Sequence, residues 1–209
     1  MLEAILLIIA LSIDAFVASI AYGANKIKIP FRSAITINLV CTALLGISLF
    51  FGSIVRELIP GNLVVLAGIF ILLGLGIYQL FQGISKSIIE KHLNKNRTIR
   101  FKLYDFRFVL EIYVDTTKAD FDRSSRLNTK EAFMLGVALS LDGLAAGFAS
   151  ALGSINYSQV LLASLVFHMA AVWLGVLIGD RFAQKAKFNI SWLSGVILIS
   201  LALVKLVRI

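Results

Sequence analysis

ALSIDAFVASIAYG, residues 10–23, holds one charged residue, Asp14, in the middle of an otherwise apolar run. An aspartate at the centre of a membrane helix costs roughly 2.5–3.5 kcal/mol on insertion scales. Such residues usually face the interior of a helix bundle and mark the path of an ion or a proton. Asp14 is therefore the first candidate functional residue.

The pattern occurs a second time, as ALSLDGLAAGFASALG at residues 138–153, with Asp142 in the place of Asp14. Of the 12 acidic residues in the chain, these two lie deep inside apolar segments. They are 128 residues apart, and Gly52 in LFFGS precedes Gly179 in VLIGD by 127. We therefore expect an internal repeat. The alternative is a chance alignment of two segments rich in leucine and isoleucine.

Composition indicates a membrane protein. Hydrophobic residues make up 59% of the 209 residues and charged residues only 15%, a balance outside the range of soluble domains. A spanning helix needs about 20 apolar residues, and the chain has six such runs: 2–22, 33–54, 62–81, 132–152, 159–178 and 190–207. We expect an all-α membrane protein with six transmembrane helices. The first run should stay in the mature protein, because no basic residue precedes it.

The 20 basic residues give a formal net charge of +8, but they lie in loops beside the apolar runs. With both termini outside, all of them except Arg56, Lys205 and Arg208 fall on the inside. This asymmetry follows the positive-inside rule. The charge therefore indicates orientation in a lipid bilayer and not a nucleic-acid partner.

Three spans in each copy of the repeat have a topological consequence. Because three is odd, the second copy must cross the membrane in the opposite sense to the first. In transporters, such an inverted repeat places the binding site at the interface between the copies. The sequence predicts a first three-helix repeat over residues 1–82, a cytoplasmic connecting loop over 83–128 and a second three-helix repeat over 129–209.

Within the connecting loop, residues 105–115, DFRFVLEIYVD, alternate between apolar and polar or charged residues. A period of two is typical of a β-strand, so we expect a short β-hairpin resting on the helix ends. A disordered linker is the alternative, although aromatic and branched residues are too frequent for it.

Small residues surround both intramembrane aspartates. Helical spacing puts Ala10 and Ala18 on the face of Asp14, and Asp142 has alanines at the same spacing. Small side chains let helices approach closely, so we expect the two carboxylates to face each other. Together they would neutralise one divalent cation, and hard oxygen ligands suit Mg²⁺, Mn²⁺ or Ca²⁺. The alternatives are structural hydrogen-bond acceptors and lone proton carriers.

His168 occupies, in the fifth apolar run, the position that Cys41 occupies in the second. It is a candidate metal ligand or proton relay, although a buried neutral histidine more often donates to a backbone carbonyl. For Cys41, Asn38 and Met169 we expect packing roles. A single cysteine also allows no intramolecular disulfide.

The segment before the fourth run, DFDRSSRLNTKE at residues 120–131, matches the spacing of an EF-hand calcium loop. Its candidate ligands are Asp120, Asp122, Ser124 and Glu131. Ser125 stands where such loops have glycine. The competing interpretation is a capping box, in which Asn128 and Glu131 start the fourth helix without any metal.

The motifs SID at Asp14 and SLD at Asp142 resemble those of the manganese efflux pump family MntP, within the LysE-type exporter group. The run ADFDRSS…EAFMLGVALSLDGLAAG (residues 119–147) and YGANKIKIPFRS (residues 22–33) resemble more closely the YtaF branch of that family, named for sporulation. The likeness covers nearly the whole chain. It implies six helices in a bacterial inner membrane, and divalent-cation export rather than an enzymatic activity.

The resemblance also shows a difference: the pumps carry a glutamate in the second span, whereas NLVCTALLGISLFFG, residues 38–52, contains no acid. Two functions stay open. The first is a secondary transporter that exports a divalent cation bound by Asp14 and Asp142. The second is a non-transporting membrane protein of sporulation, a scaffold whose cytoplasmic loop recruits a partner.

Overall fold

The structure is a computed structural model that describes residues 2–58, 62–89, 112, 116–122, 124–153, 156–182 and 192–207. Its elements are α1 (Leu2–Ala24), α2 (Phe31–Leu58), α3 (Asn62–Ile89), the 3₁₀ turn η1 (Thr116–Ala119), α5 (Thr129–Ala151), α6 (Tyr157–Phe182) and α7 (Trp192–Val207). Helices are the regular elements throughout these residues, which contain no strand. The predicted all-α architecture is confirmed to that extent.

Five of the helices are long and apolar enough to cross a membrane: α1, α2, α3, α5 and α6. Each covers one of the predicted apolar runs, except that α5 ends one residue before the end of its run. The sixth, α7, has 16 residues, fewer than the roughly 20 that a span needs. The chain is thus a multi-pass membrane protein, and the sixth span stays a prediction.

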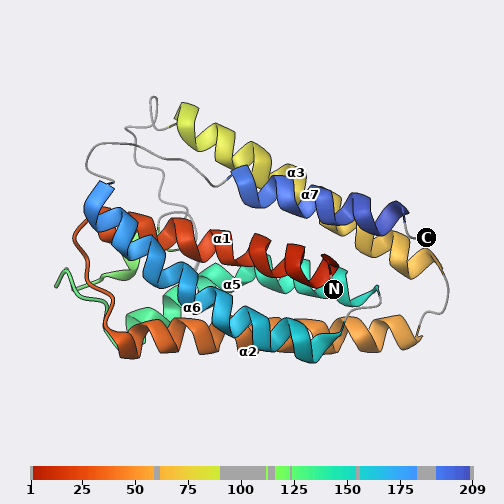
Figure 1. The fold of residues 1–209 in the computed structure, drawn as a ribbon, viewed down its shortest axis with the longest axis horizontal. Coiled ribbons are helices and arrows are strands. Elements are labelled where there is room, and N and C mark those ends of the chain that lie inside the picture. The colour runs from red at the N-terminus through yellow and green to blue at the C-terminus, as the bar shows by residue number, and fades with distance from the viewer. Residues whose placement is uncertain are drawn as a thin grey trace, which may run out of the picture.

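The helices pack in pairs. α1 packs mainly against α6, α2 against α5 and α3 against α7, while weaker contacts join α1 to α7 and α3 to α5. Figure 1 shows the α3–α7 pair lying along one side of the other four helices. The main partners of α1 and α5, the two helices with intramembrane aspartates, therefore belong to the opposite half of the chain.

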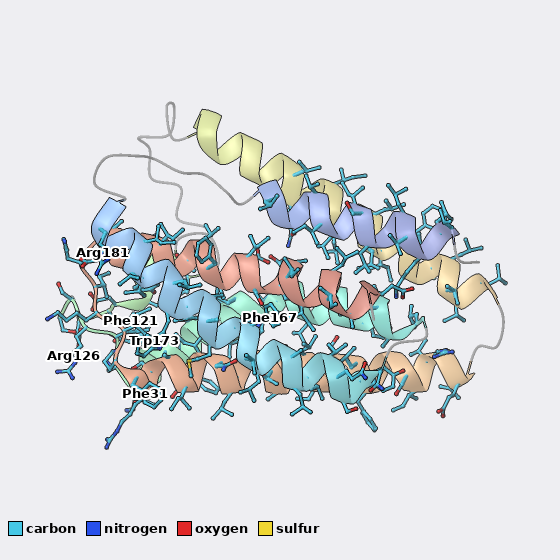
Figure 2. The ribbon with its side chains drawn as sticks, in the orientation of Figure 1. Phe31, Phe121, Arg126, Phe167, Trp173 and Arg181 are labelled. Atoms are coloured by element: carbon cyan, nitrogen blue, oxygen red, sulfur yellow. The ribbon has the colours of Figure 1, made fainter. Side chains whose placement is uncertain are left out.

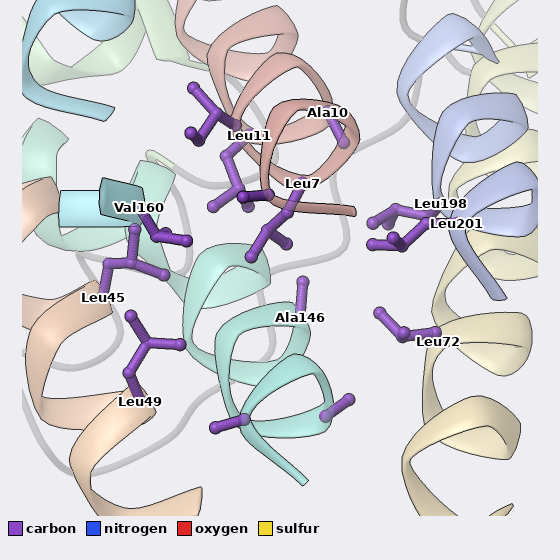
Figure 3. Close-up of a cluster of buried hydrophobic side chains, with 14 of the residues drawn as sticks. Leu7, Ala10, Leu11, Leu45, Leu49, Leu72, Ala146, Val160, Leu198 and Leu201 are labelled. Carbon is purple, nitrogen blue, oxygen red and sulfur yellow. The ribbon is translucent and has the colours of Figure 1, made fainter. Parts of the chain in front are cut away.

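Leucine and alanine side chains fill the space between the pairs (Figure 3). This core takes Leu7 and Leu11 from α1, Leu45 and Leu49 from α2, Leu72 from α3, Ala146 from α5, Val160 from α6, and Leu198 and Leu201 from α7. Large apolar side chains also lie on the outside, among them Phe167 and Trp173, which is 60% exposed (Figure 2). Such a surface suits contact with lipid.

Two glycines set how closely the paired helices approach. A β-carbon built on Gly179 of α6 would overlap the carbonyl oxygen of Ile20 on α1, and one on Gly52 of α2 would lie 2.8 Å from the carbonyl oxygen of Phe148 on α5. Real β-carbons essentially never come that close. Both crossings therefore depend on the absence of a side chain.

The β-hairpin predicted for residues 105–115 is not seen. The one residue of that segment that the structure describes, Ile112, is helical and fully buried, and the other ten lie outside the described residues. Ile112 packs in one cluster with Tyr22 and Leu127. Ile112 alone gives the hairpin no support, and the hairpin stays a prediction for residues outside those that the structure describes.

Candidate cation-binding sites

Asp14 lies half-buried on α1. It accepts a hydrogen bond from Gln79 of α3, whose Nε2 lies 3.5 Å from Oδ2 of Asp14. Gln79 is only 4% exposed, and its other amide atom, Oε1, is buried with no hydrogen-bond partner. Gln79 was not among the predicted site residues, although an amide inside the third apolar run is a signal that points to it.

Asp142 lies half-buried on α5. A β-carbon on its neighbour Gly143 would lie 3.5 Å from Cδ2 of Leu11 on α1. The two aspartate-bearing helices therefore touch close to both acids, in agreement with the small residues that surround them. The facing of the two carboxylates across this contact stays a prediction.

His168 and Cys41 line one small cavity of about 10 Å³, together with polar side chains of Thr42, Ser140 and Ser164. That volume is close to the space for one water molecule. Nδ1 of His168 lies 3.2 Å from the carbonyl oxygen of Ser164. A carbonyl only accepts, so in this bond Nδ1 carries the proton and Nε2 keeps a lone pair. Neither Asp14 nor Asp142 lines the cavity.

The residues of that region that were expected to pack also make contacts of their own. Sγ of Cys41 donates to the carbonyl oxygen of Gly136 at 3.5 Å, and Nδ2 of Asn38 donates to the carbonyl oxygen of Leu165 at 2.8 Å. Both side chains are buried between α2 and a neighbouring helix. A ligand role for His168 stays a prediction.

A group of acids lies outside the spans, where Asp120, Asp122 and Glu131 bring carboxylate oxygens within 4.8 Å of one another. In the described part of the chain this is the one group of three or more acidic, histidine or cysteine side chains with that spacing. Ser124, the fourth candidate ligand, donates its backbone N–H to Asp122 at 2.9 Å. Hydrogen bonds from Ser124 lower the pKa of Asp122, so this exposed carboxyl is ionised at neutral pH.

The capping box is confirmed. Asn128 is the N-cap of α5, and its Oδ1 accepts from the backbone N–H of Lys130 and of Glu131 at 2.9 and 3.0 Å. Glu131, which is 1% exposed, accepts in return from the N–H of Asn128 at 2.8 Å and from that of Phe121 at 2.9 Å. The four-residue turn η1 precedes the loop, where an EF-hand would have a helix.

Hydrogen bonds join the loop of residues 120–131 to the connection between α1 and α2. Lys28 and Arg126 form an isolated parallel bridge, in which the N–H of Lys28 donates to the carbonyl of Ser125 and the N–H of Leu127 donates to that of Lys28, both at 2.9 Å. Oγ of Ser33 donates to the carbonyl of Leu127 at 2.7 Å. The acidic group is thus held against the end of the bundle.

Comparison with known proteins gives a family model and several relatives, of which two are described here. The family model "Mntp: Putative manganese efflux pump" matches residues 108–206. "Probable sporulation protein YtaF" of Bacillus subtilis (strain 168) is 30% identical over 99% of this chain and 99% of its own length. "Putative manganese efflux pump MntP" of Aliarcobacter butzleri (strain RM4018) is 28% identical over 97% of each chain. No solved structure matches.

Proposed function

Because the chain belongs to the family of MntP-type efflux pumps and YtaF-type sporulation proteins, we propose that it is a secondary transporter, not an enzyme, that exports Mn²⁺ or a similar divalent cation. One observation carries the proposal: Asp14 and Asp142 lie half-buried on two membrane helices that contact each other. An ionisable residue inside a span is expensive and marks function by default.

The two carboxylates act as cation ligands. Each alone loses hydration inside the bundle, which is costly for a charged group. A divalent cation between them cancels both charges and receives oxygen ligands in place of water. Oxygen ligands favour Mn²⁺, Mg²⁺ and Ca²⁺ over metals that prefer sulfur.

We further propose six spans in two inverted repeats, α1–α3 and α5–α7. The offset of 127 or 128 residues makes α1 equivalent to α5, α2 to α6 and α3 to α7. The repeat therefore predicts that the α1–α6 pair has an equivalent in the α5–α2 pair, and that α3 pairs with its own equivalent, α7. These are the three main helix pairs. The same offset makes the close contact of Gly179 with Ile20 equivalent to the close contact of Gly52 with Phe148. Two structurally equivalent halves can rock about a site between them, as in other secondary transporters.

We place both termini outside and the α1–α2 connection in the cytoplasm. That end of the bundle carries exposed Lys28 and Arg126, and an exposed ion pair of 2.8 Å between Lys26 and Asp180. Basic residues beside the spans are retained on the cytoplasmic side. The site between the carboxylates would then open alternately toward these residues and away from them.

The experiment that tests this function replaces each acid with its amide. Asp14→Asn and Asp142→Asn keep the side-chain shape but remove a charge, so each should abolish Mn²⁺ efflux while the protein still inserts and accumulates. The double variant should add little, because non-additivity is what shared ligands produce. Cellular manganese content, measured beside protein abundance, gives the result, with Glu57→Gln on the exposed end of α2 as the matched acid-to-amide control.

Retention of full efflux by either single variant, or loss that follows only from low abundance, would contradict the proposal. The alternative, a sporulation scaffold without transport, would then gain support. It would make the cytoplasmic loop, residues 83–128, the surface that recruits a partner, and the aspartates structural hydrogen-bond acceptors.

A further inference from the structure

We infer that Gln79 is a further ligand of the exported cation, supplied by α3, and that its amide rotates when the cation binds. The inference rests on the proposed function, since it adds a ligand to the site of Asp14. Gln79 on α3 and Asp14 on α1 are joined by a hydrogen bond, with Nε2 3.5 Å from Oδ2.

The burial of Gln79 calls for a ligand. Its side chain is 4% exposed, and Oε1 is buried without a hydrogen-bond partner. A buried acceptor without a donor has lost its hydrogen bonds to water and has no protein hydrogen bond that offsets this free-energy cost. A cation beside Asp14 would supply what this oxygen lacks.

The geometry allows the oxygen to reach that cation. A donor–acceptor distance of 3.5 Å is at the long end for a hydrogen bond, so the contact between Nε2 and Asp14 is weak. The last torsion of a glutamine is broad and roughly two-fold. A half-turn about it exchanges Nε2 and Oε1, which brings a carbonyl oxygen to the side of Asp14. In the empty site the amide donates to the carboxylate, and in the loaded site both supply oxygen to the cation.

The added ligand makes the site asymmetric. With the offset of 127 residues, the position on α7 that corresponds to Gln79 is Leu206, which is 48% exposed and has no oxygen in its side chain. The ligand set is therefore two carboxylates and one neutral amide. The two negative charges of the carboxylates match the charge of a divalent cation. The neutral amide adds a third oxygen ligand but no further negative charge, which would hold the cation more tightly and slow its release.

The test measures Mn²⁺ affinity of the purified full chain in lipid nanodiscs by calorimetric titration. Gln79→Leu should weaken binding at least tenfold, because it removes the oxygen. Gln79→Glu keeps an oxygen and adds a charge, so it should bind at least as tightly as the wild type. The matched control is Asn38→Leu. Asn38 is 3% exposed and also has a carbonyl oxygen without a partner, but its amide donates to the backbone of Leu165 and not to an intramembrane carboxylate, so the affinity should not change.

The variants separate a ligand from a hydrogen-bond donor. If Gln79 acted only by donating Nε2 to Asp14, Gln79→Glu would bind as weakly as Gln79→Leu, and that result overturns the inference. Wild-type affinity in Gln79→Leu overturns it as well, while export through Asp14 and Asp142 would stand. If Gln79→Leu does not accumulate, Gln79→Glu decides alone. Absence of Mn²⁺ binding in the wild type, or unchanged affinity in Asp14→Asn and Asp142→Asn, overturns the proposed function together with the inference.

Discussion

Glu131 shows how one carboxylate fits two interpretations of the same motif. In the loop of residues 120–131, position 9 is Asn128 and position 12 is Glu131, and these are also the N-cap and the third residue of α5. The capping box thus uses the spacing that an EF-hand loop needs. Each carboxylate oxygen has two lone pairs, so hydrogen bonds from Asn128 and Phe121 leave acceptor capacity for a cation.

Ser125 satisfies the other requirement of such a loop. Its φ is 56°, in the left-handed region that usually calls for glycine. The N–H of Ser125 donates to Oδ2 of Asp120 at 3.1 Å, which helps to hold the turn. We propose on these grounds, and on the closeness of the three acids, that the loop binds Ca²⁺ or Mn²⁺ outside the transport path.

The loop proposal predicts an ion-dependent stability. Millimolar Ca²⁺ or Mn²⁺ should raise the thermal unfolding midpoint of the wild type, since a ligand that binds only the folded state stabilises it. Asp122→Ala should lose that rise without changing the midpoint in chelator. Asn128→Ala should lower the midpoint in either condition, because loss of an N-cap costs about 1 kcal/mol.

Circular dichroism in detergent measures all three midpoints. Replacement of Glu57, an exposed acid on α2, by alanine serves as the control that keeps the ion effect. A rise of equal size in the wild type and Asp122→Ala would show that the ion acts elsewhere, and the loop would then be a helix cap alone.

Single residues also show what sequence reasoning can reach. Asp14 and Asp142 were predicted because a charge inside an apolar run costs so much that it needs a functional reason. Gln79 was not among the candidates, because an amide is tolerated in a span at lower cost, and its proposed ligand role rests on its burial and on its contact with Asp14. The capping box was predicted because its residues are close in sequence.

At the level of elements, run length predicted the helices well and their ends less well. α2 continues to Leu58 and α3 to Ile89, past the predicted ends at Ile54 and Phe81. Helical hydrogen bonding continues into the polar interface, where apolar composition no longer marks the helix. The hairpin stays a prediction, because ten of the eleven residues of its segment lie outside those that the structure describes.

Helix crossings give the next prediction. Gly179→Ala should lower the unfolding midpoint, because its new methyl group would overlap the carbonyl of Ile20 and overpacking costs about 1–3 kcal/mol. The matched variant is Gly74→Ala on α3, where a β-carbon would have no heavy atom from outside its own helix within 4 Å. Alanine favours a helix over glycine by roughly 0.8–1.0 kcal/mol, so this variant should be as stable as the wild type or more so.

Thermal unfolding followed by tryptophan fluorescence compares these two variants. A loss in Gly179→Ala without a loss in Gly74→Ala would assign the effect to the crossing of α6 over α1. Equal losses would assign it to the flexibility of glycine in a helix, and the close crossing would then have no role in stability.

At the level of the whole molecule, the repeat decides which loops share a side of the membrane. With the offset of 128, Lys28 at the α1–α2 connection corresponds to Asn156 at the start of α6. Lys28 follows the end of α1 at Ala24 and Asn156 precedes the start of α6 at Tyr157, and Figure 1 shows that end of α1 and that start of α6 at opposite ends of the bundle. An inverted repeat therefore places equivalent loops on opposite sides, whereas a parallel repeat would place them on the same side.

Cysteine labelling in cells tests that arrangement. In a background with the buried Cys41 replaced by alanine, Lys28→Cys and Asn156→Cys each introduce one thiol at an exposed position. Asn156→Cys should react with a membrane-impermeant maleimide in intact cells, and Lys28→Cys only after permeabilisation, because basic loops stay in the cytoplasm. The Cys41→Ala background alone should stay unlabelled in both conditions.

If Lys28→Cys reacted in intact cells and Asn156→Cys only after permeabilisation, the inverted repeat would stand but its orientation in the membrane would be reversed. Labelling of both positions from one side would exclude the inverted repeat, and with it a transport site between two oppositely oriented halves.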